Sequence, residues 1–273
     1  MFRAGIGITT ISKKLGIPKS TLHYWRHEKH KPPTTRWIPK PTKELAYVIA
    51  VLLGDARTRI HITHYEIELR VKDYEFAEEF SKNMAKLLNK KFKKPKWSKS
   101  EQRWKVYYRS KAFYTWYKKQ TLETLKPYIE YNIETVRAFL KAIYNSEGSN
   151  HRCTVISLYN SNVELLEYAK ELLRKYFSII TAGPHLVAKK GTPVKVGKWV
   201  GVTRKDMYRI VICRRWCVRK FLREIGFSIT TKQLGLPRSK MPCTQCLNKI
   251  FKTQPTTPSK NQNQKIKNTE KIY

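Results

Sequence analysis

The hydrophobic positions of residues 43–240 switch repeatedly between a period of about 3.6, typical of helices, and a period of two, typical of strands. Apolar and polar residues alternate within 57–71, which predicts two half-buried strands. Their inner face is expected to hold Ile60, Ile62, Ile67, Leu69 and Val71. Their polar outer face is expected to hold Arg59, His61, Glu66, Glu68 and Arg70.

The same order of elements occurs twice along this stretch. In the first unit, at 43–132, the pattern predicts a helix at 45–54, the two strands, a helix at 73–90, a second hairpin at 96–110 and a final helix at 112–125. In the second unit, at 133–240, it predicts a helix at 136–146, a strand at 153–159, a helix at 162–177, longer strands and loops at 179–213 and a helix at 216–227. The fold class is therefore α+β, with two tandem αββαββα repeats.

A small helical module is predicted at residues 1–31. Two short helical patterns are separated by Gly16, which favours the left-handed turn of a helix-turn-helix, and basic residues surround both of them. The apolar residues expected inside the module are Ile11, Leu15, Leu22 and Trp25. We predict that this module contacts DNA.

Two segments of different composition join or follow these units. The linker at 32–42 is rich in Pro and cannot be helical, so it is expected to be a semi-rigid spacer. The segment at 241–273 is polar and rich in Lys, and we expect it to be disordered and to contact a nucleic-acid backbone loosely.

The net charge narrows the choice of partner. The 56 Lys and Arg residues outnumber the 20 Asp and Glu residues, which gives a formal net charge of +36 at pH 7. Such a field disfavours an ordinary small-molecule enzyme and favours a polyanion, with nucleic acid first. No membrane partner is expected, because the apolar run at 45–53 is far shorter than the roughly 18 residues of a membrane span. The five cysteines, an odd number, favour a reducing intracellular compartment, which is the cytoplasm or nucleoid, or an organelle of a host cell.

Two of the predicted helices carry small residues and an acid at matched positions. The small residues are Ala46, Ala50 and Gly54 on the first helix and Ala138, Ala142 and Ser146 on the second, at i+4 steps and at one constant offset. Such stripes allow two helix backbones to approach closely. Asp55 and Glu147 follow at the same offset, so two acids and two negative helix ends would meet, and a hard divalent cation best relieves their repulsion.

At these residues the chain resembles a known family. LAYVIAVLLGDA (45–56) and VRAFLKAIYNSEGS (136–149) are similar to the two signature helices of the monomeric, two-motif LAGLIDADG homing endonucleases. One departure is Ala56, where the family commonly has Gly. The resemblance covers roughly residues 43–240 and implies a monomer with internal pseudo-twofold symmetry. It also implies antiparallel, saddle-shaped sheets along the major groove and hydrolysis of phosphodiester bonds on both strands of double-stranded DNA.

The resemblance also implies roles for individual residues. Asp55 and Glu147 would be the catalytic acids, one for each DNA strand, and would bind Mg²⁺ (or Mn²⁺), with Gly54 and Ser146 beside them in the metal site. The ion would activate a water and stabilise the leaving 3′ oxygen. Cations at the ends of the final strands would stabilise charge on the phosphoryl oxygens or contact the backbone. These cations are Arg109, Lys111, Arg214 and Arg215.

The exposed strand faces are expected to recognise the DNA, because Arg reads guanine and Lys more often meets phosphate. The candidate DNA-binding residues of the strands and their loops are Arg57, Arg59, His61, Arg70, Arg103, Lys105, Tyr107, Arg109, Lys189, Lys195, Arg204 and Arg209. Those of the N-terminal module are Lys19 and Arg26.

Two other functions stay open. The chain could be an RNA maturase that assists splicing of its host intron by binding that RNA, or a DNA-binding transcription regulator that does not cut. The two acids at matched positions favour cleavage, because a pure binder would gain by losing two crowded negative charges. Four cysteines, Cys213, Cys217, Cys243 and Cys246, could form a zinc site, but their mixed strand and helix positions favour ordinary thiols.

Overall fold

The computed structural model describes residues 2, 5–27, 37–196 and 199–237, and of Lys195, Val196 and Trp199 only the backbone. The predicted tail at 241–273, the first part of the predicted linker, and Cys243 and Cys246 lie outside these residues. No helix of the described ranges is long and apolar enough to cross a membrane.

The first unit is a four-stranded antiparallel sheet in the order β1-β2-β4-β3, with α4 packed on its inner face. Its elements are α3 (Lys43–Leu53), β1 (Arg57–His61), β2 (His64–Val71), α4 (Tyr74–Leu87), β3 (Lys96–Ser98), β4 (Arg103–Arg109), α5 (Lys111–Tyr117) and α6 (Leu122–Ile129).

The second unit repeats this arrangement with a sheet in the order β5-β6-β10-β7. Its elements are α7 (Ile133–Glu147), β5 (Gly148–His151), β6 (Val155–Asn160), α8 (Val163–Phe177), β7 (Ala182–Ala188), β8 (Pro193–Val196), β9 (Trp199–Val202), β10 (Met207–Ile212), α9 (Arg215–Glu224) and α10 (Thr230–Gln233). Along the chain, the antiparallel ribbon β8–β9 is inserted between β7 and β10, which pair directly with each other. The first unit has no such insertion between β3 and β4. The predicted α+β class with two tandem sheets is confirmed.

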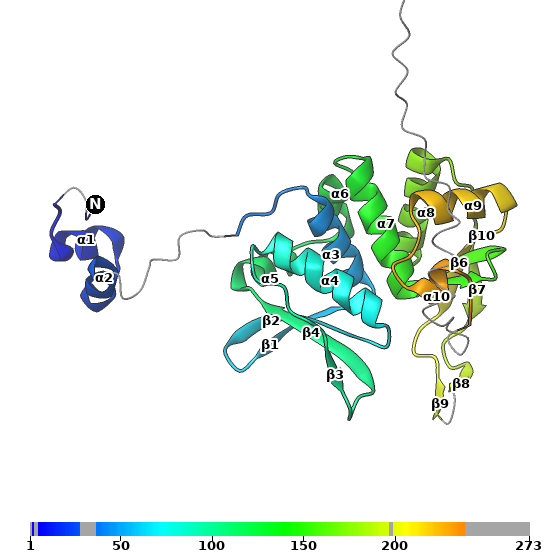
Figure 1. Ribbon diagram of the computed structural model, residues 1–273, viewed down its shortest axis with the longest axis horizontal. Helices are drawn as coiled ribbons and strands as arrows, with labels where there is room; N and C mark the ends of the chain where they lie inside the picture. The colour runs from blue at the N-terminus through cyan, green and yellow to red at the C-terminus, as the bar shows by residue number, and fades with distance from the viewer. Residues whose placement is uncertain (1, 3–4, 28–36, 197–198, 238–273) are drawn as a thin grey trace, which may run out of the picture.

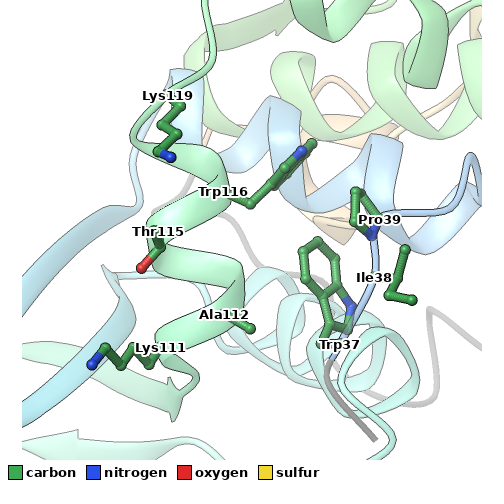
Figure 2. A pocket seen from close by; sticks show the side chains of 8 residues that line it. All are labelled: Trp37, Ile38, Pro39, Lys111, Ala112, Thr115, Trp116 and Lys119. Atoms are coloured by element: carbon green, nitrogen blue, oxygen red, sulfur yellow. The ribbon is translucent and has the colours of Figure 1, made fainter.

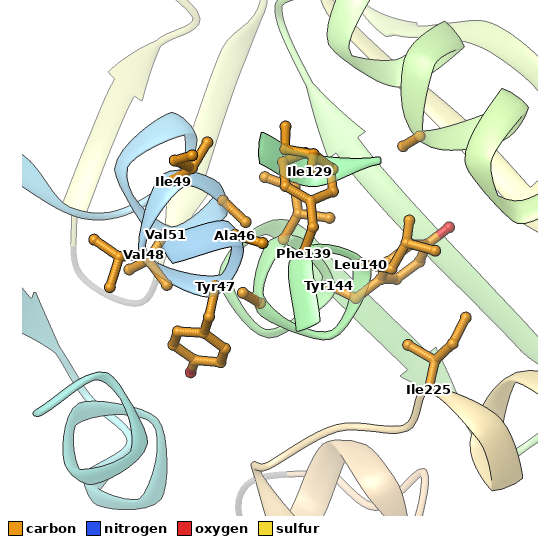
Figure 3. Close-up of a cluster of buried hydrophobic side chains, with 14 of the residues drawn as sticks. Ala46, Tyr47, Val48, Ile49, Val51, Ile129, Phe139, Leu140, Tyr144 and Ile225 are labelled. Carbon is orange, nitrogen blue, oxygen red and sulfur yellow. The ribbon is translucent and has the colours of Figure 1, made fainter. Parts of the chain in front are cut away.

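The helices α3 and α7 lie side by side at the centre, with one sheet on either side (Figure 1). Residues 45–52 of α3 are all buried, as expected for a helix that is apolar all round. Each helix has a defined start, because the Thr42 side chain accepts from the backbone N–H of Leu45 and Asn132 forms a capping box with Thr135. Figure 3 shows the two helices in contact within the core, with Ala46 on the side of α3 that faces α7.

Three local predictions were wrong. Ile60 and Ile62 are 56% and 82% exposed, because the hairpin turns at Ile62, which has a φ of 56°, and leaves both side chains outside the core. The helix predicted at 112–125 is two helices, since Thr121 forms a capping box with Thr124 and starts α6. Leu15 of the N-terminal module is 49% exposed rather than inside.

The N-terminal module contains α1 (Ile8–Leu15) and α2 (Lys19–Arg26) in contact with each other. Gly16 ends α1 with a φ of 64°, which is the left-handed turn that the sequence predicted. Ile11 and Leu22 are buried between the helices, and each eight-residue helix buries only that one side chain fully. Two short helices with so small a core leave most of their side chains exposed.

The end of the linker is attached to the first unit by Trp37. Its Nε1 donates to the carbonyl oxygen of Leu87 at 3.0 Å, and its ring packs edge-on against Phe113 and Trp116. Figure 2 shows Trp37, Ile38 and Pro39 lining a pocket against α5. The described residues 37–42 therefore lie on the body of the protein.

Candidate active site

The two central helices approach each other closely at Gly54, the residue that ends α3. A Cβ built on Gly54 would lie 2.6 Å from Cβ and 2.9 Å from Oγ of Ser146, and 3.4 Å from Cγ of Glu147. These distances leave no room for any side chain at position 54. The small residues predicted to form an interface thus place the two helix ends in direct contact.

A second glycine sets the direction of the chain after α7. Gly148 follows Glu147 and starts β5, and a Cβ there would lie 2.4 Å from the carbonyl oxygen of Tyr144. The chain therefore passes from α7 into the sheet without a loop. As a result, the Glu147 side chain is held at the junction of the central helix and the second sheet.

The two predicted acids meet at this junction. Asp55 is exposed, whereas Glu147 is half-buried. Burial and the negative charge of Asp55 raise the pKa of the Glu147 carboxyl from 4.5 to about 7, while Lys232 acts in the opposite direction. The two carboxylates are thus close enough for the charge of Asp55 to add to the effect of burial on Glu147.

The surroundings of the acids suit a hard divalent cation. The Oγ of Ser146 is buried and makes no hydrogen bond within the described part of the chain. Oxygen atoms are therefore the available ligands here, and Mg²⁺ and Mn²⁺ prefer oxygen. No group of three or more His, Cys, Asp and Glu in residues 37–196 or 199–237 could hold a metal ion alone. The donor set fits a cation that would take its remaining ligands from a bound anion.

Three cations that the sequence did not single out for catalysis lie beside Asp55. Lys72, Arg103 and Lys232 line, with Asp55 and Ser146, a cavity of ≈ 200 Å³. The Lys232 ammonium donates to the carbonyl oxygen of Asn145 at 2.6 Å, so a positive charge stands at the negative end of α7. Arg103 had been predicted to bind DNA, whereas no local signal in the sequence points to Lys72 or Lys232.

The segment that carries Lys232 connects both units. The Asn145 side chain donates to Oγ of Ser228 at 2.7 Å and accepts from its backbone N–H at 3.0 Å. Thr230 donates to Glu75 of α4 through its backbone N–H at 3.1 Å. Since one end of this segment is fixed to α7 and the other to α4, Lys232 is held in place at the acids.

The four cations predicted at the strand ends lie elsewhere. Arg109 contacts Glu66, with its Nε at 3.1 Å from Oε1, and Lys111 lines the pocket of Trp37. Arg214 and Arg215 are exposed at the start of α9. None of the four lines the described cavities that contain Asp55. Their catalytic role stays a prediction.

The predicted DNA-binding residues of the first unit gather on the outer face of its sheet. Arg57, Arg70 and Arg103 line a cavity of ≈ 460 Å³ together with Asp55, Glu68 and Glu101. Arg59 and Lys105 lie on the same face, where they contact Glu66 and Glu68. His61 is exposed at the end of β1, and the ring of Tyr107 lies 4.7 Å from Nζ of Lys93.

The corresponding residues of the second unit and of the N-terminal module are more dispersed. Arg209 is exposed on β10, where its hydrogen bond helps lower the pKa of the Tyr159 hydroxyl against the opposing effect of burial. The exposed residues of the loops and of α2 are Lys189, Arg204, Lys19 and Arg26. Lys195 lies on β8, where only the backbone is described. These placements allow DNA contact and do not test it.

Comparison with known proteins identifies relatives. No family model matches the chain. It is 31% identical to the uncharacterized protein MJ0398 of Methanocaldococcus jannaschii over 236 residues, which are 84% of this chain and 83% of that protein. The chain belongs to the same family as MJ0398. It is also 32% identical to the uncharacterized protein MJ0314 of that organism, over 50% of this chain and 55% of the relative.

Solved structures similar to this member of the family include DNA complexes. The structure of I-DmoI in complex with DNA and Mn has a TM-score of 0.48 and 19% identity, over 68% of this chain and 98% of that chain. The homing endonuclease I-WcaI bound to its DNA recognition sequence has a TM-score of 0.43 and 12% identity, over 76% and 95%. The N-terminal LAGLIDADG domain of WhiA has a TM-score of 0.42 and 14% identity, over 77% and 89%. I-DmoI and I-WcaI are LAGLIDADG homing endonucleases, the family that the helices at 45–56 and 136–149 resemble.

Proposed function

We propose that the protein is a site-specific, metal-dependent DNA endonuclease that hydrolyses one phosphodiester bond on each strand of a long recognition site. The observation that carries the proposal is the contact of the two helix ends at Gly54 and Ser146, which holds Asp55 and Glu147 together. A protein that only binds DNA has no use for two crowded carboxylates, because they repel phosphate.

Asp55 and Glu147 would hold the divalent cation, Mg²⁺ or Mn²⁺, with Ser146 and the carbonyl of Gly54 beside it. The bound ion supplies a nucleophile at neutral pH and stabilises charge on the reacting phosphate. Because two acids so close together reach opposite strands only across the narrow minor groove, about 6 Å wide, each acid would serve one strand.

The cations in the cavity beside Asp55 would bind and orient the scissile phosphate. Lys72 and Arg103 stand on the side of the first sheet, and Lys232 stands at the end of α7. Together they would offset the negative potential of the acids and of the helix ends, which otherwise repels phosphate.

Cleavage of a defined substrate tests the proposed function. We expect the purified full chain to linearise a plasmid that carries the joined sequences flanking its own gene, in Mg²⁺ or Mn²⁺ and not in EDTA. A plasmid without this junction is the control. If no divalent ion supports double-strand cleavage of the junction, the chain is a binder of DNA or RNA and not a nuclease.

We further propose that α1 and α2 form an accessory DNA contact. Replacing both Lys19 and Arg26 by Gln should weaken binding of the recognition site and make its salt dependence shallower by about 0.9 for each phosphate that the variant no longer neutralises. Cleavage at saturating protein should stay unchanged, because the acids are untouched. The matched control replaces two exposed lysines of α4, Lys82 and Lys86, by Gln. An unaltered salt slope in the double variant of α2 would exclude the proposed role of this module.

A further inference from the structure

Two glutamates on the polar face of β2 are almost fully buried beneath basic side chains. The side chain of Glu66 is 2% exposed and that of Glu68 is 0% exposed. Alternation along β2 turns Ile67 and Leu69 into the core, so Glu66 and Glu68 point to the outer face. Burying a carboxylate costs free energy unless cations surround it. Here five cations contact the two carboxylates between them.

Glu68 is held by four cations from three strands. The most distant is Arg59, whose Nε lies 3.5 Å from Oε2 of Glu68. The Nε and Nη2 of Arg57 donate to its Oε2 at 3.0 and 2.9 Å. The Nη2 of Arg70 lies 3.0 Å and the Nζ of Lys105 lies 3.2 Å from its Oε1. Burial alone would raise the pKa of Glu68, but Arg70, Arg57 and Lys105 outweigh it and hold that pKa below its ordinary value.

Glu66, two residues before Glu68 on the same face of β2, has a similar arrangement of cations. The Nε and Nη2 of Arg59 donate to its Oε2 at 3.1 and 2.9 Å, and the Nε of Arg109 donates to its Oε1 at 3.1 Å. Strand register explains the choice of partners, because Glu66 lies directly opposite Arg59 on β1 and opposite Arg109 on β4. This network of ion pairs is therefore encoded by cross-strand pairing.

The geometry of these pairs leaves a specific edge of Arg57 and of Arg59 for DNA. Arg70 differs, because its Nη2 contacts Glu68 and its Nη1 contacts Glu101. Arg57 and Arg59 both contact glutamate with the Nε–Nη2 side of the guanidinium. A guanine is read by two donors at once, and the Nη1–Nη2 end of a guanidinium still offers two. The side chains of the five cations remain between 21% and 54% exposed, so that their ends reach solvent.

The glutamates also reduce unspecific attraction. Each carboxylate cancels one positive charge within the cluster, and unspecific affinity for duplex DNA depends on how many phosphates the protein neutralises. A side chain that is already immobilised loses less conformational freedom on binding. Both effects favour base contacts over phosphate contacts.

We propose that Glu66 and Glu68 are positioning residues. They hold Arg57, Arg59, Lys105 and Arg109 for reading base edges in the half of the DNA site that the first sheet contacts. This inference rests on the DNA-binding part of the proposed function and not on cleavage. It predicts an asymmetric protein, because β5, β6, β7 and β10 contain no Asp or Glu. Arg209 of the second sheet is paired with Tyr159 instead.

The test is selection of binding sites from a randomised duplex library, with the full chain in EDTA so that no cleavage interferes. Wild type should enrich a site with two halves. Glu68→Gln keeps the shape of the side chain and removes its charge, and it should lower base preference about 10-fold in one half only, the effect of losing one well-placed arginine contact. Its affinity for random duplex should rise, with a steeper salt dependence.

Glu101→Gln is the matched control for charge. Glu101 pairs with Arg70 at the rim of the same face and is 38% exposed. Its replacement changes the net charge by the same amount, so it should raise the affinity for random duplex and leave base preference unchanged. If Glu68→Gln fails to fold, Glu66→Gln carries the same test, since Glu66 contacts Arg59 and Arg109.

Three results would overturn the proposal. They are unchanged base preferences in the folded glutamate variants, an equal loss in both halves of the site, and a wild type that binds duplex without any sequence preference. A wild type that selects a site but cuts no DNA would instead contradict the nuclease function and leave this inference standing.

Discussion

Asp55→Asn and Glu147→Gln should each abolish double-strand cleavage, with a fall in rate of about 10³-fold or more. Each variant removes one of the two charges that hold the divalent cation, and the reacting phosphate then loses its main source of charge stabilisation. Binding of the recognition site, measured in EDTA, should stay within about 3-fold, because the basic surfaces are unchanged and one repelling charge is gone. The measurement is single-turnover cleavage of a plasmid carrying the site.

The same substitution of Glu147 should stabilise the protein without metal. Its pKa in the folded chain is about 7 against an ordinary value of 4.5, so folding is favoured by this group below about pH 4.5 and loses that contribution as the pH rises through 7. At pH 8 in EDTA, Glu147→Gln should therefore raise the free energy of unfolding by about 2 kcal/mol. Thermal unfolding against pH measures it, and the control is Glu164→Gln, at an exposed position of α8.

These two outcomes together separate a functional acid from a structural one. Replacing a residue that only supports the fold would lower activity and stability in parallel. A Glu147→Gln variant that still cuts both strands at the wild-type rate would remove Glu147 from the site. A variant that is less stable than wild type at pH 8 would show that the acids do not repel each other.

Gly54→Ala should reduce cleavage about 10²-fold and lower the free energy of unfolding by about 1 to 3 kcal/mol. The added Cβ would lie 2.6 Å from Cβ of Ser146, so the helix ends must separate and carry Asp55 away from Glu147. Measured cleavage rates and thermal unfolding check both effects. Gly7→Ala is the control, because a Cβ at Gly7 meets nothing within 4 Å.

A double variant distinguishes close approach from a general defect of the fold. Ser146→Gly removes the atoms that the new methyl group would strike. Combined with Gly54→Ala, it should restore much of the lost stability, since the two changes then occupy the space of one side chain. Additive losses in the double variant would contradict the role that we assign to this contact.

Most of the framework follows from local patterns. The all-apolar stretch at 45–52 predicted a buried helix, and alternation at 64–71 predicted a strand with one face in the core, as the structure has them. The matched positions of Gly54 with Ser146 and of Asp55 with Glu147 in two similar helices predicted which residues meet. These features depend on residues a few positions apart, so their spacing can be taken directly from the sequence.

The predictions that were wrong concern the ends of elements, where neighbouring residues favour different structures. A continuous helical pattern at 112–125 concealed a capping box at Thr121, which gains more by starting α6 than by continuing α5. Ile60 and Ile62 fit a strand pattern, but the turn at Ile62 ends the inner face of the sheet before it reaches them. Periodicity describes an element and says little about where it stops.

Local sequence patterns were enough to predict the two-unit α+β plan, the pair of helices with small residues and the acids at their ends. Only the tertiary structure decided that Lys232 stands at the end of α7 and that Glu68 is buried under Arg57, Arg70 and Lys105. The reason is physical: helix and strand periods are set by backbone geometry between near neighbours, whereas the neighbours of a side chain are set by how distant elements pack. Lys232 of α10 acquires its surroundings only when both units have folded, and Glu68 acquires its own only when β1, β2 and β4 have paired.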